Sequence, residues 1–239
     1  MEHNHTPLNP NNPIGQINIF ALPRSGGTII NIFLRKFLCY KCSLIHPNMI
    51  HSDKASQYGP LNIKLLRHPL GIFGSQLHVD SIDRSSNKVR VSEHNAKAKL
   101  NDILEMYRKF EEFFDKNKDC DTISVIKYED YHKKYDYFKQ IANDIYKIDI
   151  DEEEFNKFKS NYAVEEVRND IYSGQQEERD FRPNHVSTSR GDNFVNVKLI
   201  PDSIRQDVED KLFPYIDKYG YERINLSDYP FEKSRDLLA

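Results

Sequence analysis

The segment from Ile17 to Leu38 constrains the fold more than any other part of the sequence. It opens with the short apolar run INIFAL, passes through a loop of proline, serine and glycine, and continues with apolar residues at helical spacing. An apolar run that stops at such a loop is typical of a buried strand, and the later spacing suits a helix buried on more than one side. The sequence therefore predicts a strand over 17–22 and a helix over 28–38.

This alternation of strand and helix continues along the chain. The sequence predicts further strands over 42–50, 62–66 and 122–127 and further helices over 97–117, 135–146, 151–160 and 201–218. Strands that alternate with helices favour an α/β fold, in which a central parallel β-sheet is flanked by helices on both faces. A chain of 239 residues suits one domain, so we expect residues 1–15 to form a flexible N-terminal arm and residues 16–239 to form that domain.

Composition and charge narrow the classes of function. The N-terminus does not begin with basic residues. No apolar run in the sequence approaches the roughly 18 residues of a membrane helix, so we expect a cytoplasmic protein with no membrane partner. The net charge is −3, yet the stretch His3–His78 carries seven basic residues and one acid. Nucleic-acid binders usually show a broader basic bias, whereas a small polyanion needs only a local positive site. The N-terminal third is therefore expected to bind a small anion, with no nucleic-acid partner.

The three cysteines, Cys39, Cys42 and Cys120, are too few and odd in number for a secreted disulfide framework. Cys39 and Cys42 form a C-x-x-C pair, a spacing found in redox pairs and zinc sites as well as among free thiols. No second Cys or His pair stands at ligand spacing, which favours free thiols over a zinc site.

The loop after the first strand reads Ala21-Leu-Pro-Arg-Ser-Gly-Gly-Thr28. It has the frame of the nucleotide-binding pattern G-x-x-x-x-G-K-[ST], but Gly27 stands in place of the lysine. Small residues still allow the backbone N–H groups of 25–28 to face an anion at the N-terminus of the next helix, and Arg24 adds a cation at the loop apex. A plain turn before a helix needs no arginine, so the loop predicts an anion site.

A second candidate anion site follows the strand 62–66, where the sequence reads Arg67-His-Pro-Leu-Gly-Ile-Phe-Gly-Ser75. Pro69 suits the first turn of a helix, which places Ser75 two turns in. Arg67 would lie at the carboxyl edge of the sheet, where ligands bind in open α/β folds. The alternative is an ordinary connection between strand and helix.

Five segments, in order, resemble the sulfotransferases, which transfer a sulfuryl group from 3'-phosphoadenosine 5'-phosphosulfate (PAPS) to an acceptor hydroxyl or amine. P-R-S-G-G-T at 23–28 is similar to the 5'-phosphosulfate loop of that family, and the segment 67–75 matches its 3'-phosphate pattern R-x-P-x-x-x-x-x-S. Three later segments are similar too: Tyr128-Glu-Asp130, Ala163-Val-Glu-Glu-Val-Arg-Asn169 and Asn184-His-Val-Ser-Thr-Ser-Arg-Gly191. The resemblance covers about residues 17–219.

The resemblance implies a P-loop nucleoside-triphosphate-hydrolase-like sulfotransferase fold, PAPS as donor, adenosine 3',5'-bisphosphate as product and no metal. It implies that Arg24 is catalytic and that these residues bind the donor: Arg24, Ser25, Gly26, Gly27, Thr28, Arg67, Ser75, Tyr128, Arg190 and Gly191. The chain also departs from the family pattern. Gly27 replaces a hydroxyl residue of the loop, and Val164 stands where the family often has an adenine-stacking phenylalanine.

A histidine suits the role of general base because its ordinary pKa of ~6.5 lies close to working pH. In similar enzymes the base follows the second strand and precedes the strand that ends at the 3'-phosphate arginine, and Met49-Ile-His-Ser52 occupies that place. His51 is therefore the predicted base, with His46 and His78 as alternatives. The polar segments 78–96 and 172–198 are expected to border the acceptor, a small molecule or a glycan.

Two other classes of function share the predicted anion site. A P-loop kinase or NTPase uses a lysine to reach the β- and γ-phosphates, which this loop lacks. A non-catalytic protein that binds adenosine bisphosphate would have the site without turnover. Magnesium dependence separates the kinase from the sulfotransferase, and turnover separates the binding protein from both.

Overall fold

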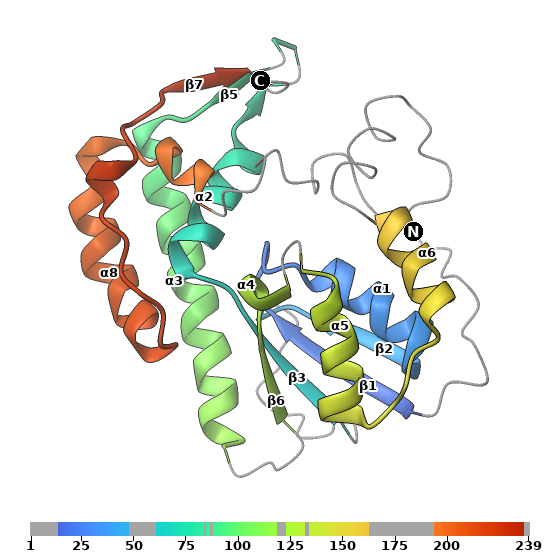
Figure 1. The fold of residues 1–239 in the computed structure, drawn as a ribbon. Helices are drawn as coiled ribbons and strands as arrows, with labels where there is room; N and C mark the ends of the chain where they lie inside the picture. The colour runs from blue at the N-terminus through green and yellow to red at the C-terminus, as the bar shows by residue number, and fades with distance from the viewer. Residues whose placement is uncertain are drawn as a thin grey trace.

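The computed structural model describes residues 14–47, 61–83, 85–86, 88–118, 123–131, 134–162 and 194–236. At its centre lies a parallel sheet of four strands in the order β2-β1-β3-β6 (Figure 1). The strands are β1 (Ile14–Ala21), β2 (Cys39–Ile45), β3 (Leu61–Leu66) and β6 (Ile123–Lys127). β1 pairs with β2 on one side and with β3 on the other, so it is an inner strand of the sheet.

Helices cover both faces of the sheet because β1 carries apolar side chains on both sides. Ile17, Ile19 and Ala21 are buried in a cluster with α1 (Gly27–Phe37), α5 (Asp136–Gln140) and α6 (Glu152–Tyr162). Phe20 is buried in a second cluster, with α2 (Pro69–Asp80), α3 (Glu93–Lys116) and α8 (Arg205–Lys218) (Figure 1). Burial on both faces is what a near-continuous apolar strand requires. The predicted α/β class, a central parallel sheet flanked by helices, is confirmed.

Several predicted elements are present with shifted ends. β1 starts at Ile14, so residues 14 and 15, expected in the N-terminal arm, belong to the sheet; residues 1–13 lie outside the described residues. β2 begins and ends earlier than the predicted 42–50, because α1 ends at Phe37 and only Leu38 separates the two elements. Cys39 on this strand is buried and Cys42 half-buried, and neither is in a disulfide bond within the described residues.

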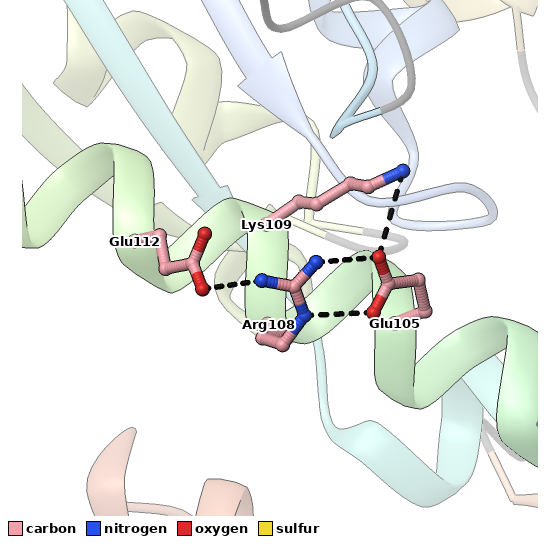
Figure 2. A network of polar contacts seen from close by, with 4 residues as sticks. All are labelled: Glu105, Arg108, Lys109 and Glu112. Atoms are coloured by element: carbon pink, nitrogen blue, oxygen red, sulfur yellow. Dashed lines mark hydrogen bonds and ion pairs between the residues drawn. The ribbon is translucent and has the colours of Figure 1, made fainter. Parts of the chain in front are cut away.

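α3 shows how the helical pattern of the sequence is used. Ser92 caps its N-terminus, where the side-chain oxygen accepts a hydrogen bond from the Asn95 N–H at 3.2 Å. On its outer face Arg108 donates to both carboxylate oxygens of Glu105, at 2.7 and 2.6 Å, and also contacts Glu112 (Figure 2). Exposed ion pairs contribute little stability, so the apolar face decides the packing. That face consists of Leu100, Ile103, Tyr107, Phe110, Phe113 and Phe114.

Two of the three later predicted helices, 135–146 and 201–218, change their geometry along their length. The helix predicted over 135–146 starts as α5 and continues as the π-helical segment η3 (Ile141–Ile145). The helix predicted over 201–218 starts as the 3-10 turn η6 (Asp202–Ile204) and continues as α8. The described residues also include three further short helices, α4 (Tyr128–Tyr131), η5 (Val195–Leu199) and η7 (Leu226–Asp228).

A second, antiparallel sheet has no counterpart in the sequence patterns. It consists of β4 (Ile82–Asp83), β5 (Lys88–Arg90) and β7 (Ser234–Asp236), in the order β4-β5-β7, so the C-terminal segment returns to lie beside residues 88–90 (Figure 1). Strands of two or three residues are too short to show a period of two. Most of the segment 78–96, expected as a polar border, is therefore part of α2, this sheet and the start of α3.

The segment after the undescribed residues 163–193 packs closely on α2. A Cβ atom at Gly74 would lie 2.7 Å from the carbonyl carbon of Asn196, so the backbone of η5 approaches α2 at a distance that only glycine permits. Tight packing there keeps α2, which carries Ser75, in a fixed place. No helix within the described residues is long and apolar enough to cross a membrane.

Candidate active site

The carboxyl ends of the four parallel strands meet at one edge of the sheet, and each is followed by a residue singled out in the sequence. The loop of Arg24 follows β1, His46 follows β2, Arg67 follows β3 and Tyr128 follows β6. The chain leaves β1 toward β2 on one side and later returns to β3 on the other. That is the point of an open parallel sheet at which ligands bind.

The loop between β1 and α1 has a backbone that ordinary side chains disfavour. Arg24 has φ 63° and Gly26 has φ 79°, both in the left-handed region. For an arginine this conformation costs roughly 1–2 kcal/mol, so the surroundings must hold it in place. A Cβ atom at Gly26 would collide with the Tyr131 hydroxyl and lie 2.5 Å from the Tyr128 ring, so glycine is required there for space as well as for conformation.

Hydrogen bonds close the loop from within and from α4. The buried Ser25 donates its hydroxyl to the Leu22 carbonyl at 2.5 Å, and the Tyr131 hydroxyl donates to the Ser25 carbonyl at 3.1 Å. Among the described residues no side chain caps α1 at Gly27, so the N–H groups of its first turn, which includes Thr28, have no side-chain acceptor there. The positive end of the α1 dipole adds to their preference for an anion.

Arg24 joins this loop to both other parts of the predicted site. Its Nε donates to the Ser75 Oγ at 3.1 Å, and its backbone carbonyl accepts a hydrogen bond from an Arg67 terminal nitrogen at 2.5 Å. The Arg67 guanidinium in turn lies 4.4 Å from the centre of the Tyr128 ring. The structure therefore brings together four of the predicted site residues: Arg24, Arg67, Ser75 and Tyr128.

Two neighbouring guanidinium groups make this edge of the sheet strongly positive. Burial and, to a lesser extent, the charge of Arg67 lower the pKa of Arg24 to about 10. Arg24 still carries its charge at neutral pH, but its cationic form is less favourable than in water. A bound anion would offset that cost, which is the electrostatic behaviour expected of an anion site. Within the described ranges no group of three or more His, Cys, Asp or Glu residues is placed to hold a metal ion.

The predicted histidines have different surroundings. His46 comes directly after β2, and its Nδ1 lies 3.0 Å from the Ala21 carbonyl, so in the neutral ring Nδ1 carries the proton and Nε2 the lone pair. His78 is buried on α2, and its Nδ1 has no hydrogen-bond partner among the described residues. Burial and the charges of Arg235 and Arg24 lower the pKa of His78 to about 4. His51, Arg190 and Gly191 lie outside the described residues.

Sequence patterns did not predict the hydrogen bonds that Glu129 accepts. The Glu129 carboxylate accepts hydrogen bonds from the His68 N–H and the Tyr221 hydroxyl, each at 2.9 Å. Glu129 is the middle residue of Tyr128-Glu-Asp130, which the resemblance marks as a segment without assigning a role to this carboxylate. Nothing in the local sequence signals Tyr221, because its partner is 92 positions away.

The buried His78 predicts a pH dependence of stability. Its folded-state pKa of about 4 lies below the ordinary 6.5, so between these values the unfolded chain binds the additional proton. The stabilisation from neutral His78 is therefore complete above pH 6.5 and is lost as the pH falls toward 4. Between pH 7 and pH 5 the loss should be about 2 kcal/mol in the free energy of unfolding. Urea unfolding at both pH values should show a smaller drop for His78→Gln than for the natural chain, and equal drops would contradict the assignment.

Comparison with known proteins bears on the fold. No protein-family model matches the sequence, and no curated protein sequence matches it. The structure is similar to that of mouse sulfotransferase SULT7A1 complexed with PAP, with a TM-score of 0.55 and 13% sequence identity over 90% of this chain and 89% of that chain. At this identity the likeness bears on the fold alone. The parallel four-stranded sheet flanked by helices is therefore a sulfotransferase-like fold.

Proposed function

We propose that this protein is a sulfotransferase, which transfers a sulfuryl group from PAPS to the hydroxyl or amine of an acceptor and releases adenosine 3',5'-bisphosphate (PAP). One observation carries the proposal. Arg24, at the apex of the loop assigned to the 5'-phosphosulfate, contacts both Ser75 and Arg67, the residues assigned to the 3'-phosphate. The similarity to a sulfotransferase complexed with PAP supports the same donor class.

The two phosphates of the donor would be bound by different parts of the sheet edge. The N–H groups at the start of α1, with Ser25, Gly26, Gly27 and Thr28, would hold the 5'-phosphosulfate. Arg67 and Ser75 would hold the 3'-phosphate, with Tyr128 packed against the Arg67 guanidinium. Arg190 and Gly191, assigned through the family resemblance, would complete the donor site. No metal ion is needed for such contacts, because backbone N–H groups, hydroxyls and guanidinium groups neutralise the anion.

The chemistry needs a cation on the transferring group and a base for the acceptor. As the sulfur–oxygen bond to the 5'-phosphate breaks and a bond to the acceptor oxygen or nitrogen forms, Arg24 would stabilise negative charge on the departing phosphate oxygen. The acceptor loses its proton to a general base in the same step. In the described structure the Arg24 Nε donates to the Ser75 Oγ, so the guanidinium lies at the carboxyl edge of the sheet.

Two histidines are candidates for the base. The family resemblance points to His51, which stays a prediction because it lies outside the described residues. The geometry favours His46, since it directly follows β2 and the Ala21 carbonyl holds the tautomer that leaves Nε2 free to accept a proton. The lowered pKa of His78 makes that residue a weaker base than an ordinary histidine.

A kinase or NTPase is the alternative enzyme class, and the loop argues against it. A Cβ atom at Gly27 would lie 2.7 Å from a methyl group of Leu44, so β2 takes the space in which a lysine would begin at that position. A non-catalytic protein that binds PAP would share every contact described above and differ only in turnover.

Ligand binding tests the donor. PAP should stabilise the protein in EDTA, because both phosphate sites are built from protein groups. A ligand at 100 times its dissociation constant adds about 2.7 kcal/mol to the free energy of unfolding, which chemical denaturation can measure. Strong stabilisation by ATP with magnesium, together with no effect of PAP, would contradict the proposal and favour the kinase. Sulfate transfer from PAPS then separates an enzyme from a binding protein.

Removal of the Arg67 guanidinium tests the assignment of the 3'-phosphate. Arg67→Ala should weaken PAP by about 1.5–3 kcal/mol, the usual contribution of a charged hydrogen bond, and should weaken adenosine 5'-phosphate much less. Isothermal titration calorimetry with both ligands measures the difference. Arg108→Ala is the matched control, because Arg108 is exposed on the outer face of α3. Equal weakening of both ligands by Arg67→Ala would place Arg67 elsewhere.

Substitution of the two candidate histidines identifies the base. His46→Asn keeps an N–H donor for the Ala21 carbonyl but has no counterpart of Nε2, so single-turnover transfer from PAPS should fall by about 10²- to 10⁴-fold while PAP affinity stays unchanged. His51→Ala should keep most of the transfer rate. The reverse result would assign the role to His51.

A further inference from the structure

Glu129 connects three parts of the chain that are far apart in sequence. It is the second residue of α4, which directly follows β6. One carboxylate oxygen accepts the backbone N–H of His68, at the end of β3, and the other accepts the hydroxyl of Tyr221, in the segment after α8. The carboxylate thus joins two neighbouring strand ends to the C-terminal part of the molecule.

Hydrogen bonds hold the backbone N–H and both ring nitrogens of His68. Besides the N–H bond to Glu129, its Nδ1 accepts the Leu70 N–H at 3.3 Å and caps α2, while its Nε2 donates to the Glu222 carbonyl at 2.9 Å. Its ring also packs on Phe194 and Tyr221, with centroids 4.8 and 5.3 Å away. Burial lowers the pKa of His68, which keeps the ring neutral with one donor and one acceptor. The backbone next to Arg67 therefore has little freedom.

The hydrogen bond from the His68 N–H to Glu129 joins the two residues that directly follow Arg67 and Tyr128. Arg67 precedes His68, and Tyr128 precedes Glu129. The Arg67 guanidinium rests 4.4 Å from the Tyr128 ring centre, an arrangement that needs the ends of β3 and β6 in register. Adjacent Cα atoms are only about 3.8 Å apart, so a shift of either turn moves the guanidinium relative to the ring.

A carboxylate this close to a phosphate site would by its charge alone weaken binding of the phosphate. Its two oxygens instead each accept a hydrogen bond from the protein. We propose that Glu129 is a positioning residue for recognition of the 3'-phosphate: it holds the backbone of His68 so that Arg67 stays on the Tyr128 ring and points its guanidinium at the phosphate. The proposal rests on the proposed PAP site, and Glu129 acts through His68 without touching the ligand.

The test compares two ligands that differ only in the 3'-phosphate. Calorimetry with PAP and with adenosine 5'-phosphate provides the ratio of their dissociation constants for the unsubstituted chain and for Glu129→Ala, Glu129→Gln and Asp130→Ala. Glu129→Gln keeps a carbonyl oxygen for the His68 N–H and an amide group that can bond the Tyr221 hydroxyl. Asp130→Ala is the matched control, because it removes an exposed carboxylate from the adjacent position of the same helix.

In Glu129→Ala the preference for PAP over adenosine 5'-phosphate should fall by about tenfold, whereas in Glu129→Gln and Asp130→Ala it should stay within about twofold of the natural chain. A residue with only a structural role would lower the unfolding temperature without changing this ratio. An unchanged ratio in Glu129→Ala overturns the proposal. An equal loss in Glu129→Gln and Glu129→Ala overturns it too, because Glu129→Gln keeps the acceptor for the His68 N–H, and the loss would then not come from that hydrogen bond.

A second variant covers the case in which Glu129→Ala does not fold. Tyr221→Phe removes one hydroxyl and leaves the apolar packing of the ring in place, so it should lower the ratio by about threefold, and an unchanged ratio then overturns the proposal. Failure of the proposed function has a different signature. In that case the natural chain itself shows no preference for PAP over adenosine 5'-phosphate, whatever the variants do.

Discussion

The left-handed backbone at Arg24 is the local feature around which the candidate site is arranged. An arginine does not adopt this conformation without support, and here the support comes from two directions. Arg67 donates to its carbonyl and Ser75 accepts from its side chain, so the loop after β1, the end of β3 and the second turn of α2 are linked through one residue. The result is a pair of neighbouring cations, Arg67 buried and Arg24 half-buried, at the carboxyl edge of the sheet. Such a pair has an electrostatic cost that an anionic ligand would offset.

The order of the strands makes this link possible. β1 lies between β2 and β3, so a loop that leaves β1 lies beside the turns that follow both neighbours. β6 extends the sheet beyond β3 and brings Tyr128 against Arg67. A sheet in another order would carry the same side chains at the ends of its strands without bringing them together.

The C-terminal part of the chain packs on and hydrogen-bonds to the elements that form this edge of the sheet. η5 packs on α2 at Gly74, Tyr221 bonds to Glu129, and the Glu222 carbonyl accepts from His68. Arg235 on β7 binds the Asn196 side chain and the Val195 carbonyl, both at 3.1 Å, which ties the small sheet to η5. The site residues that the structure describes come from the first 128 positions, yet their placement depends on segments beyond position 194.

Local sequence patterns predict the strands of the parallel sheet and most of its helices, and with them the α/β class. Apolar runs, helical spacing and stops at glycine or proline are set by neighbours a few residues apart, so the strand at 62–66 and the helix at 97–117 are found within a few residues of their predicted ends. The motif at 23–28 also predicted a loop of small residues between the first strand and the first helix, where the structure has one. These features are local, and local patterns are what a single sequence displays.

Which side chains meet could be seen only in the folded structure. The sequence paired Arg67 with Ser75 as anion ligands, whereas the structure shows Arg24 in contact with both, across 43 and 51 positions. It also places His46 at the end of β2, since α1 and β2 are joined through one residue, and it assigns Glu129 two partners 61 and 92 positions away. Contacts over such separations depend on strand order, on where each strand ends and on the return of the C-terminal segment. Local sequence patterns carry none of this information, so these contacts could not be predicted from the sequence.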